Sequence, residues 1–198
     1  MGDGKWSYLR SDFAEVCTDA QSRMSSFTTD EQLSLQVEGT PKVSWMTTPD
    51  STYRALVYYA APSSPAPVKV FTVNNVLCPK IKRLQTLDPL KTDPVSFVAL
   101  WLSANRKYVN ITFDVKTGSS GSDADGQSIG AVLTDMTRNA DGTLTAHITF
   151  CHDQGNVPQY YSSRQYASLA VAQMQDADSA SIVINSYKGQ VVKTISLK

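Results

Sequence analysis

The stretch FCHDQGNVPQYYSSRQYASL, residues Phe150 to Leu169, decides how the second half of the chain folds. It begins with the pattern of a β-strand, is broken at Gly155 and Pro158, and resumes a strand pattern at Tyr166. It also holds one of the two histidines, one of the three cysteines and three of the nine tyrosines. We therefore predict a corner around Gly155 and Pro158, where one strand ends and the next one begins after it.

Two strictly alternating segments lie upstream of this corner. Every second residue is apolar in residues 108–115 and 143–150, which is the period of a half-buried strand. The apolar positions are Val109, Ile111, Phe113 and Val115 in the first segment, and Leu144, Ala146, Ile148 and Phe150 in the second. Gly142 permits a turn before the second segment, and Ser179–Ser186 with Gln190–Leu197 predict a closing hairpin. Several strands with frequent turns predict an antiparallel β-sandwich.

The first half of the chain has a different pattern of short strands. Residues 33–37 alternate, residues 53–59 and 68–77 are rich in aromatic and β-branched residues, and prolines separate the latter two. About five strands in about 80 residues predict a small barrel. Residues 80–94 are charged and contain Pro89 and Pro94, so they predict a linker. We therefore expect an all-β protein with domains at residues 1–86 and 87–198.

The charge balance disfavours nucleic acid as a partner. The 18 basic and 18 acidic residues cancel, which leaves no long-range attraction toward a polyanion. The only short basic cluster, Lys80-Ile81-Lys82-Arg83, is typical of a solvated linker. No run approaches the roughly 18 consecutive apolar residues of a membrane helix.

Cysteine spacing and the glycine-rich stretch predict no metal or cofactor. Cys17, Cys78 and Cys151 form no CxxC motif, so a zinc site is disfavoured. Three free thiols, or one Cys17–Cys78 disulfide with one free thiol, both fit this odd number. Residues 118–126 contain an Asp-x-Asp-Gly fragment but lack the acids of an EF-hand loop, so a solvated hairpin loop is favoured over a weak calcium site.

The corner itself admits a catalytic, a structural and a binding interpretation. Adjacent residues of a strand point to opposite faces, so Cys151 and His152 are not placed to act together. A hydrolase using His152 and Asp153 is therefore the least favoured alternative. The structural interpretation makes a hydrogen-bonded corner of His152, Asp153, Gly155 and Pro158, with His152 on the inward face. The binding interpretation makes an exposed edge of Gln154, Tyr160, Tyr161 and Arg164.

The same residues carry a family resemblance. The pattern His152-Asp153-Gln154-x3-Pro158-x-Tyr160-x3-Arg164-x-Tyr166-x-Ser168-Leu169 resembles that of the NigD-like proteins. Further stretches agree in order along nearly the whole chain, namely Ser11–Ala20, Tyr53–Tyr59, Asp93–Val95, Trp101, Lys107–Asn110 and Ile182–Gly189. One departure is the strand after the glycine-rich loop, Gln127–Leu133, which lacks the family's histidine and aromatic residues.

The resemblance implies an N-terminal OB-like barrel followed by a C-terminal β-sandwich. It also implies a lipid-anchored protein of the periplasm or outer membrane of Gram-negative anaerobes, whose lipobox cysteine would precede Asp3. It carries over no catalytic residue, cofactor or metal. We therefore expect a non-enzymatic cell-envelope lipoprotein that binds an unknown protein or glycan, with a bacteriocin immunity role as the alternative. Contact with the membrane would be through the lipid anchor alone.

Overall fold

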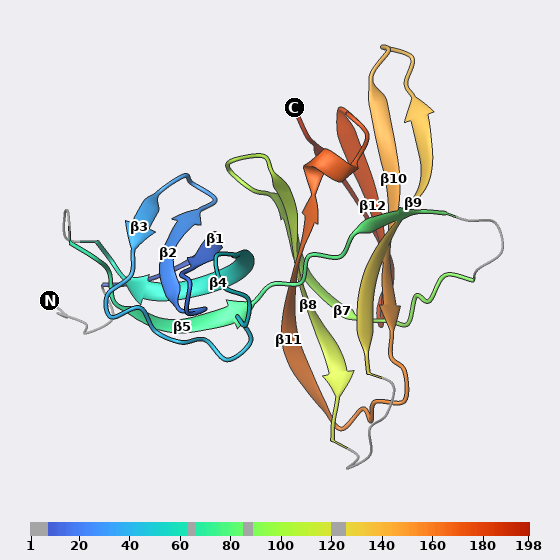
Figure 1. Ribbon diagram of the computed structural model, residues 1–198. Coiled ribbons are helices and arrows are strands. Elements are labelled where there is room, and N and C mark those ends of the chain that lie inside the picture. Colours follow the sequence, from blue (N-terminus) through green and yellow to red (C-terminus); the bar gives the residue numbers. More distant parts are fainter. Residues whose placement is uncertain (1–7, 63–65, 85–88, 120–125) are drawn as a thin grey trace, which may run out of the picture. The chain divides into compact units, whose positions relative to one another are not determined.

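The computed structural model describes residues 8–62, 66–84, 89–119 and 126–198 (Figure 1). The chain divides into two compact units, Met1–Val76 and Leu77–Lys198. Among the described residues, the only helical segment is a single 3-10 turn, Val171–Gln173, and every other element is a strand. The described part of the chain contains no helix with the length and apolar character needed to cross a membrane. The predicted all-β class is confirmed.

The first unit is a five-stranded barrel with OB-like order. Its strands are β1 (Leu9–Thr18), β2 (Met24–Thr29), β3 (Ser34–Gln36), β4 (Thr52–Ala60) and β5 (Val70–Asn75). They lie in the order β3-β2-β1-β4-β5, and every neighbouring pair is antiparallel. A parallel bridge between Val37 and Val68 joins the ends of β3 and β5 and closes the barrel. This confirms the predicted OB-like barrel.

The barrel core is built by alternate residues of its strands. Ala14 and Val16 of β1 are fully buried, as are Phe27 of β2 and Tyr59 of β4. The rings of Phe27 and Tyr59 meet edge to face with centroids 5.0 Å apart. The Tyr59 hydroxyl donates a hydrogen bond of 2.7 Å to Asp12. Burial, and then this carboxylate, raise the pKa of Tyr59 far above its usual value, so the hydroxyl stays protonated and keeps donating.

The second unit packs a five-stranded sheet against a three-stranded sheet. The larger sheet has the order β13-β12-β10-β9-β6 and the smaller has the order β11-β8-β7. The strands are β6 (Ile81–Arg83), β7 (Ser96–Leu102), β8 (Tyr108–Thr117), β9 (Ser128–Arg138), β10 (Leu144–Asp153), β11 (Tyr161–Ala170), β12 (Ser179–Ser186) and β13 (Gly189–Ser196). Pairing is mostly antiparallel, as predicted, but β10 with β12 and β6 with β9 are parallel. The larger sheet is therefore mixed.

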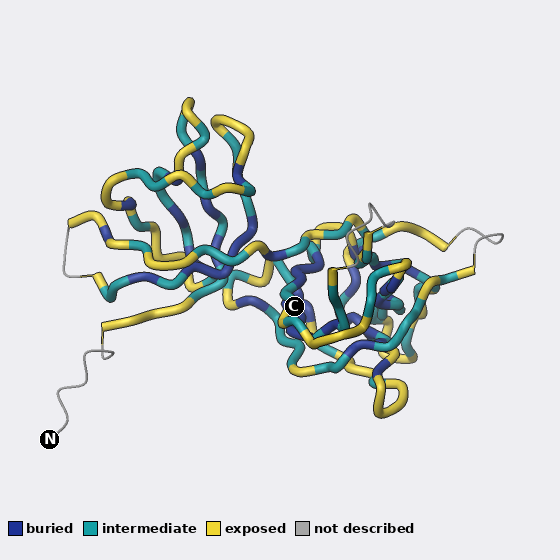
Figure 2. Tube along the Cα trace, turned by 90° about the horizontal axis from the view of Figure 1, so that it is seen from below, coloured by how far each residue is buried: buried dark blue, intermediate teal, exposed yellow. Residues whose placement is uncertain are grey.

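The apolar positions predicted for the sandwich core are buried, but the half-buried character predicted for β8 is wrong, because Asn110 and Thr112 on its other face are buried as well. Val109, Ile111, Phe113 and Val115 of β8 are all buried, and so are Ala146, Ile148 and Phe150 of β10. Phe113 and Phe150 come from opposite sheets and meet edge to face with centroids 5.0 Å apart. Figure 2 shows the buried residues concentrated on the strands inside each unit. The apolar face of each strand is thus the one that the period of two indicates.

The turns follow the sequence with one shift. Gly142 and Gly189 both have positive φ, at 84° and 107°, as the predicted turns require. The closing hairpin forms between β12 and β13. After the corner, however, the strand begins at Tyr161, five residues before the predicted restart at Tyr166, because pairing with β8 extends to Thr117. Strand pairing here overrides the polar sequence of residues 161–165.

The prediction of a linker at residues 80–94 is wrong, because both ends of this segment pair with strands of the second unit. Ile81–Arg83 forms β6, which pairs with Ala131–Leu133 of β9. Thr92 and Val95 form parallel bridges to His152 and Ser186. Short charged edge strands resemble linkers in sequence, because edges carry charge to prevent association. The boundary predicted between residues 86 and 87 lies outside the described residues.

Cys17, Cys78 and Cys151 all lie in the described part of the chain, and none of them forms a disulfide. Cys78 belongs to the second unit, whereas Cys17 lies on β1 of the barrel. Of the two alternatives that the cysteine count allowed, the Cys17–Cys78 disulfide is therefore absent.

Candidate functional site

The corner after β10 is held by residues 91–95, which lie between the ends of the parallel strands β10 and β12. Strands β10 and β12 pair as far as Phe150 and Ile184, and the segment 91–95 then continues the ladder on both sides. The His152 amide donates to Lys91 at 3.0 Å, and the Asp93 amide donates to the His152 carbonyl at 2.8 Å. The side-chain amide of Asn185 also donates to the Thr92 carbonyl. The strand end is thereby fixed from both directions.

His152 lies at the centre of this corner with a side chain that is inward and 1% exposed. Its Nδ1 lies 3.1 Å from the Asp93 carbonyl, which can only accept a hydrogen bond. Nδ1 therefore carries the proton, and Nε2 accepts from the Gln127 amide nitrogen at 3.0 Å. Both ring nitrogens are thus engaged by structural partners, as the structural interpretation expects.

Two glutamine amides cap the main chain of β8 where its neighbour has ended. Strand β7 begins at Ser96, opposite Asp114, so the Lys116 carbonyl lies beyond the reach of that strand. Gln127 and Gln154 donate to this carbonyl at 2.9 and 3.0 Å. Among the described residues, no buried side-chain nitrogen or oxygen is left without a hydrogen bond. The corner is a fully satisfied polar network.

Gln154 belongs to this network rather than to an exposed edge. It is 8% exposed, and its amide nitrogen also donates to the Val157 carbonyl at 3.0 Å. Its main-chain amide donates to Asp93, while Asp153 accepts from the Gly155 amide. The prediction of Gln154 as an exposed binding residue is therefore wrong, because the turn needs its amide for capping.

The two tyrosines after the corner are exposed. Tyr160 is 76% exposed and Tyr161 is 58% exposed. One edge of the Tyr160 ring lies against Gly118, where an added Cβ would come within 2.7 Å of the ring and 3.1 Å of Pro158. Gly118 thus allows Pro158 and Tyr160 to sit close to the end of β8. One edge of the Tyr160 ring therefore packs on the main chain at Gly118, and the rest of the ring faces solvent.

Arg164 lies on β11 directly opposite Asp114 of β8. Its guanidinium forms an ion pair with this carboxylate, and the second nitrogen lies 3.3 Å from the second oxygen. The hydrogen bond to Asp114 raises the pKa of Arg164 above its usual value. The sequence predicted the exposure of Tyr160 and Tyr161. Tyr161 and Arg164 are three residues apart on β11, so their side chains point to opposite faces of the strand. The sequence gave no signal for Gln127, Asp93 or Gly118, which are distant along the chain.

Cys151 is a half-buried thiol and lacks the geometry of a nucleophile. It points to the opposite face of β10 from His152 and lies 3.6 Å from the Thr149 carbonyl. Burial raises the pKa of the Cys151 thiol, which disfavours the reactive thiolate.

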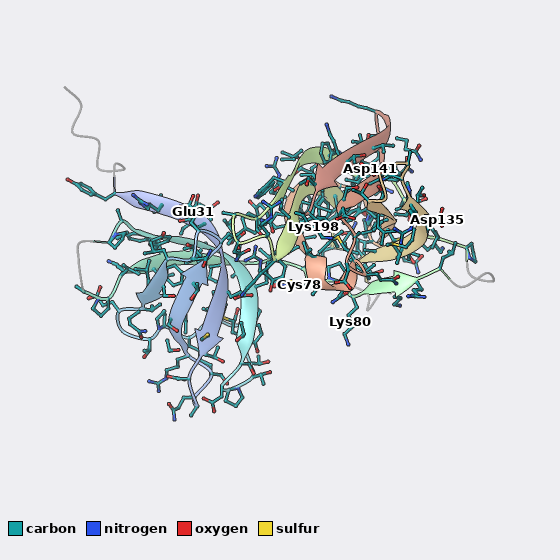
Figure 3. All side chains as sticks on the ribbon, turned by 90° about the horizontal axis from the view of Figure 1, so that it is seen from above. Glu31, Cys78, Lys80, Asp135, Asp141 and Lys198 are labelled. Carbon is teal, nitrogen blue, oxygen red and sulfur yellow. The ribbon has the colours of Figure 1, made fainter. Side chains whose placement is uncertain are left out.

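We expect Cys151 to be alkylated by iodoacetamide at pH 8 several-fold more slowly than Cys78. Cys78 is exposed and lies on the surface of the second unit (Figure 3). Peptide mass spectrometry of a time course gives each rate separately. The control is the chain in urea, where the two rates should converge. An equal or faster rate at Cys151 in the folded protein would restore the nucleophile interpretation.

The described residues contain no group of three histidine, cysteine or acidic side chains that could hold a metal ion. Of the glycine-rich stretch 118–126, residues 120–125 lie outside the described part, so the weak calcium site stays a hypothesis.

One comparison with known proteins identifies a family. Residues 79–198 match the family model described as the NigD-like C-terminal beta sandwich domain. A search of curated proteins finds no match.

Three solved structures with this fold come from species of Bacteroides and Parabacteroides. A NigD-like immunity protein from Bacteroides caccae ATCC 43185 has a TM-score of 0.66 and 18% identity, over 94% of this chain and 91% of that one. A putative toxin-related protein from Parabacteroides distasonis ATCC 8503 has a TM-score of 0.68 and 19% identity, over 94% and 92%. A protein of unknown function from Bacteroides vulgatus ATCC 8482 has a TM-score of 0.70 and 15% identity, over 95% and 90%. At these identities the likeness establishes the fold alone.

Proposed function

Since the chain belongs to the family with the NigD-like C-terminal β-sandwich domain, we propose that it is a non-enzymatic binding protein of the cell envelope. Its ligand is a protein or a glycan, and its recognition surface contains Tyr160, Tyr161 and Arg164. The observation that carries this proposal is a pair of exposed tyrosines on a rigid, fully hydrogen-bonded corner.

Rigidity makes this surface suited to recognition. Exposed tyrosines offer a large contact area with a polar tip, and they lose little side-chain freedom on binding. The turn that presents them is fixed by the Gln154 amide through the Val157 carbonyl, and Tyr160 rests on Gly118. Binding therefore does not have to order the backbone first, which lowers its entropic cost.

The hydrogen bonds of His152 and Asp153 within the corner disfavour catalysis by these two residues. His152 is buried with both ring nitrogens bonded, and Asp153 accepts from the turn at Gly155. Neither is placed to hold a proton for a bound substrate. The hydrolase alternative therefore has no geometric support at this corner.

We propose that the protein lies in the periplasm or at the outer membrane and is held there by a lipid anchor. The family resemblance supports this location, and the balanced charge argues against a nucleic-acid partner. Fractionation of the source bacterium, with labelled palmitate to detect acylation, tests it. Recovery of an unacylated protein from the cytoplasm would contradict it.

Replacement of both tyrosines, Tyr160→Ala with Tyr161→Ala, is expected to weaken binding to the ligand by about tenfold or more. Candidate ligands come from a glycan array and from cross-linked envelope extracts, and affinity is measured by biolayer interferometry. The control is Tyr187→Ala, which removes a tyrosine that is 46% exposed elsewhere on the same unit. Equal affinity of the double variant and the wild type would remove the tyrosines from the recognition surface.

An immunity role is the second candidate, and the name of the B. caccae structure is what favours it. It is a special case of protein binding, in which the partner is a bacteriocin or its target. A deletion strain should then become more sensitive to a bacteriocin of its own community. Unchanged sensitivity across a bacteriocin panel would eliminate this role and leave the binding proposal intact.

A further inference from the structure

The outer edge of β11 beside the two tyrosines is unpaired. Strand β11 is the last strand of the sheet β11-β8-β7, so one side of its main chain has no neighbouring strand. Its register with β8 runs from Tyr161 to Ala170 without a bulge. Main-chain groups of successive residues therefore alternate strictly between the β8 side and the outer side.

Contacts of Leu77 identify the residues that face outward. The Leu77 amide donates to the Tyr166 carbonyl at 2.9 Å, and the Ser168 amide donates to the Leu77 carbonyl at 2.8 Å. Tyr166 and Ser168 thus face away from β8. By alternation, Ser162 and Arg164 face the same way, and within the described residues their outward N–H and C=O groups have no hydrogen-bond partner. Leu77 shows that this edge accepts a parallel strand residue.

The open part of the edge has little of the usual protection against strand addition. Natural edge strands carry charged residues, above all lysine, or a proline or a bulge to prevent pairing. Residues 161–165 contain neither lysine nor proline, and their register has no bulge. The one charge, on Arg164, is paired with Asp114 on the neighbouring strand. Ser162 and Ser163 are small, so another backbone can approach closely.

We infer that the ligand is a protein that binds through an extended segment, which adds as a strand to the edge of β11 at Ser162 and Arg164. Each of the two residues presents one main-chain N–H and one C=O to the outer side. The two pairs of groups lie about 6.8 Å apart, which is the distance between alternate residues of an added peptide strand. Tyr160 and Tyr161 would then pack on side chains at one end of the added strand. This inference rests on the proposed function and deepens it, because it selects a peptide over a glycan.

The test removes one main-chain donor and keeps the fold. Ser162→Pro deletes an outward N–H that no described residue accepts, and proline is tolerated at such edge positions. Ser162→Ala keeps the N–H and removes only the hydroxyl. The probe is a random linear heptapeptide library displayed on phage and selected against the whole protein. Enriched peptides are synthesised, and their affinity for each variant is measured by fluorescence anisotropy.

We expect Ser162→Pro to weaken peptide binding by about tenfold or more and Ser162→Ala to change it less than about twofold. Bound peptide should also slow hydrogen exchange at the amides of Ser162 and Arg164, which gives a readout independent of any substitution. A melting temperature of Ser162→Pro close to that of the wild type verifies that the variant is folded.

Three results would overturn the inference. The first is a selection that enriches no peptide, or peptides that bind Ser162→Pro as well as the wild type. The second is a glycan that binds the wild type and Ser162→Pro equally but fails to bind the Tyr160→Ala, Tyr161→Ala variant; the proposed function would then stand without strand addition. The third is a dimer in sedimentation equilibrium that Ser162→Pro dissociates, because a second copy would then occupy the edge.

Discussion

Replacement of Arg54 by alanine is expected to lower the free energy of unfolding of the barrel unit by about 3–5 kcal/mol. Arg54 on β4 forms a two-pronged ion pair with Asp30, at 2.6 and 2.7 Å, and its side chain is 3% exposed. The guanidinium carbon also lies 5.6 Å from the centre of the Phe13 ring. Removal of the guanidinium leaves the largely buried Asp30 carboxylate without this partner, which is more costly than loss of the pair as a whole.

Hydrogen exchange measured by mass spectrometry resolves this effect by unit, because barrel peptides report separately from sandwich peptides. Exchange should accelerate in β1 and β4 and stay unchanged in β8 and β10. The matched control is Arg23→Ala, which removes an exposed arginine from the same unit and should change stability by less than about 0.5 kcal/mol. An Arg54→Ala protein as stable as the control would show that the pair is not a determinant of the barrel.

The core-facing residues of β8 and β10 could be predicted because their apolar residues recur with a period of two. Val109, Ile111, Phe113 and Val115 all proved to be buried, and the parity counted from Leu144 placed His152 inside. Such predictions need only the pleat of the strand and one apolar partner layer. Gly142 and Gly189 marked turns for an equally local reason, since their φ values are positive.

Pairing between distant segments could not be predicted in the same way. Ile81–Arg83 is too short and too charged for a pattern, and the bridges of Thr92 and Val95 depend on where β10 and β12 diverge. The parallel pairing of β10 and β12 could not be predicted from the sequence either, because no local signal distinguishes parallel from antiparallel partners in a mixed sheet. These features are properties of the assembled fold.

The candidate site was predicted in part for the same reason. The sequence placed a corner at residues 152–158 and exposed tyrosines after it, since Gly155 and Pro158 interrupt the strand and two tyrosines follow. It assigned Gln154 to the surface because a polar residue beside a turn is usually solvated. The carbonyl that Gln154 caps belongs to Lys116, 38 residues away, and it is uncovered only because β7 starts late.

This capping role predicts the second large effect, a loss of about 2–3 kcal/mol of sandwich stability in Gln154→Ala. The substitution removes donors to the Lys116 and Val157 carbonyls and the acceptor that faces Gln127. The Val157 carbonyl loses the contact that holds the turn before Tyr160, so limited proteolysis within residues 155–160 should accelerate. Urea denaturation followed by circular dichroism measures the stability, and mass spectrometry locates the cleavage.

The matched control is Gln159→Ala, which removes an exposed glutamine from the same segment and should leave both readouts unchanged. A double-mutant cycle with Gln127→Ala isolates the network, because the two amides share the Lys116 carbonyl and contact each other at 3.1 Å. We expect a coupling of at least about 1 kcal/mol. Additive effects would mean that each amide acts alone. If the coupling is found, weaker ligand binding by Gln154→Ala than by Gln159→Ala would link the rigidity of the buried corner to recognition by the tyrosines beside it.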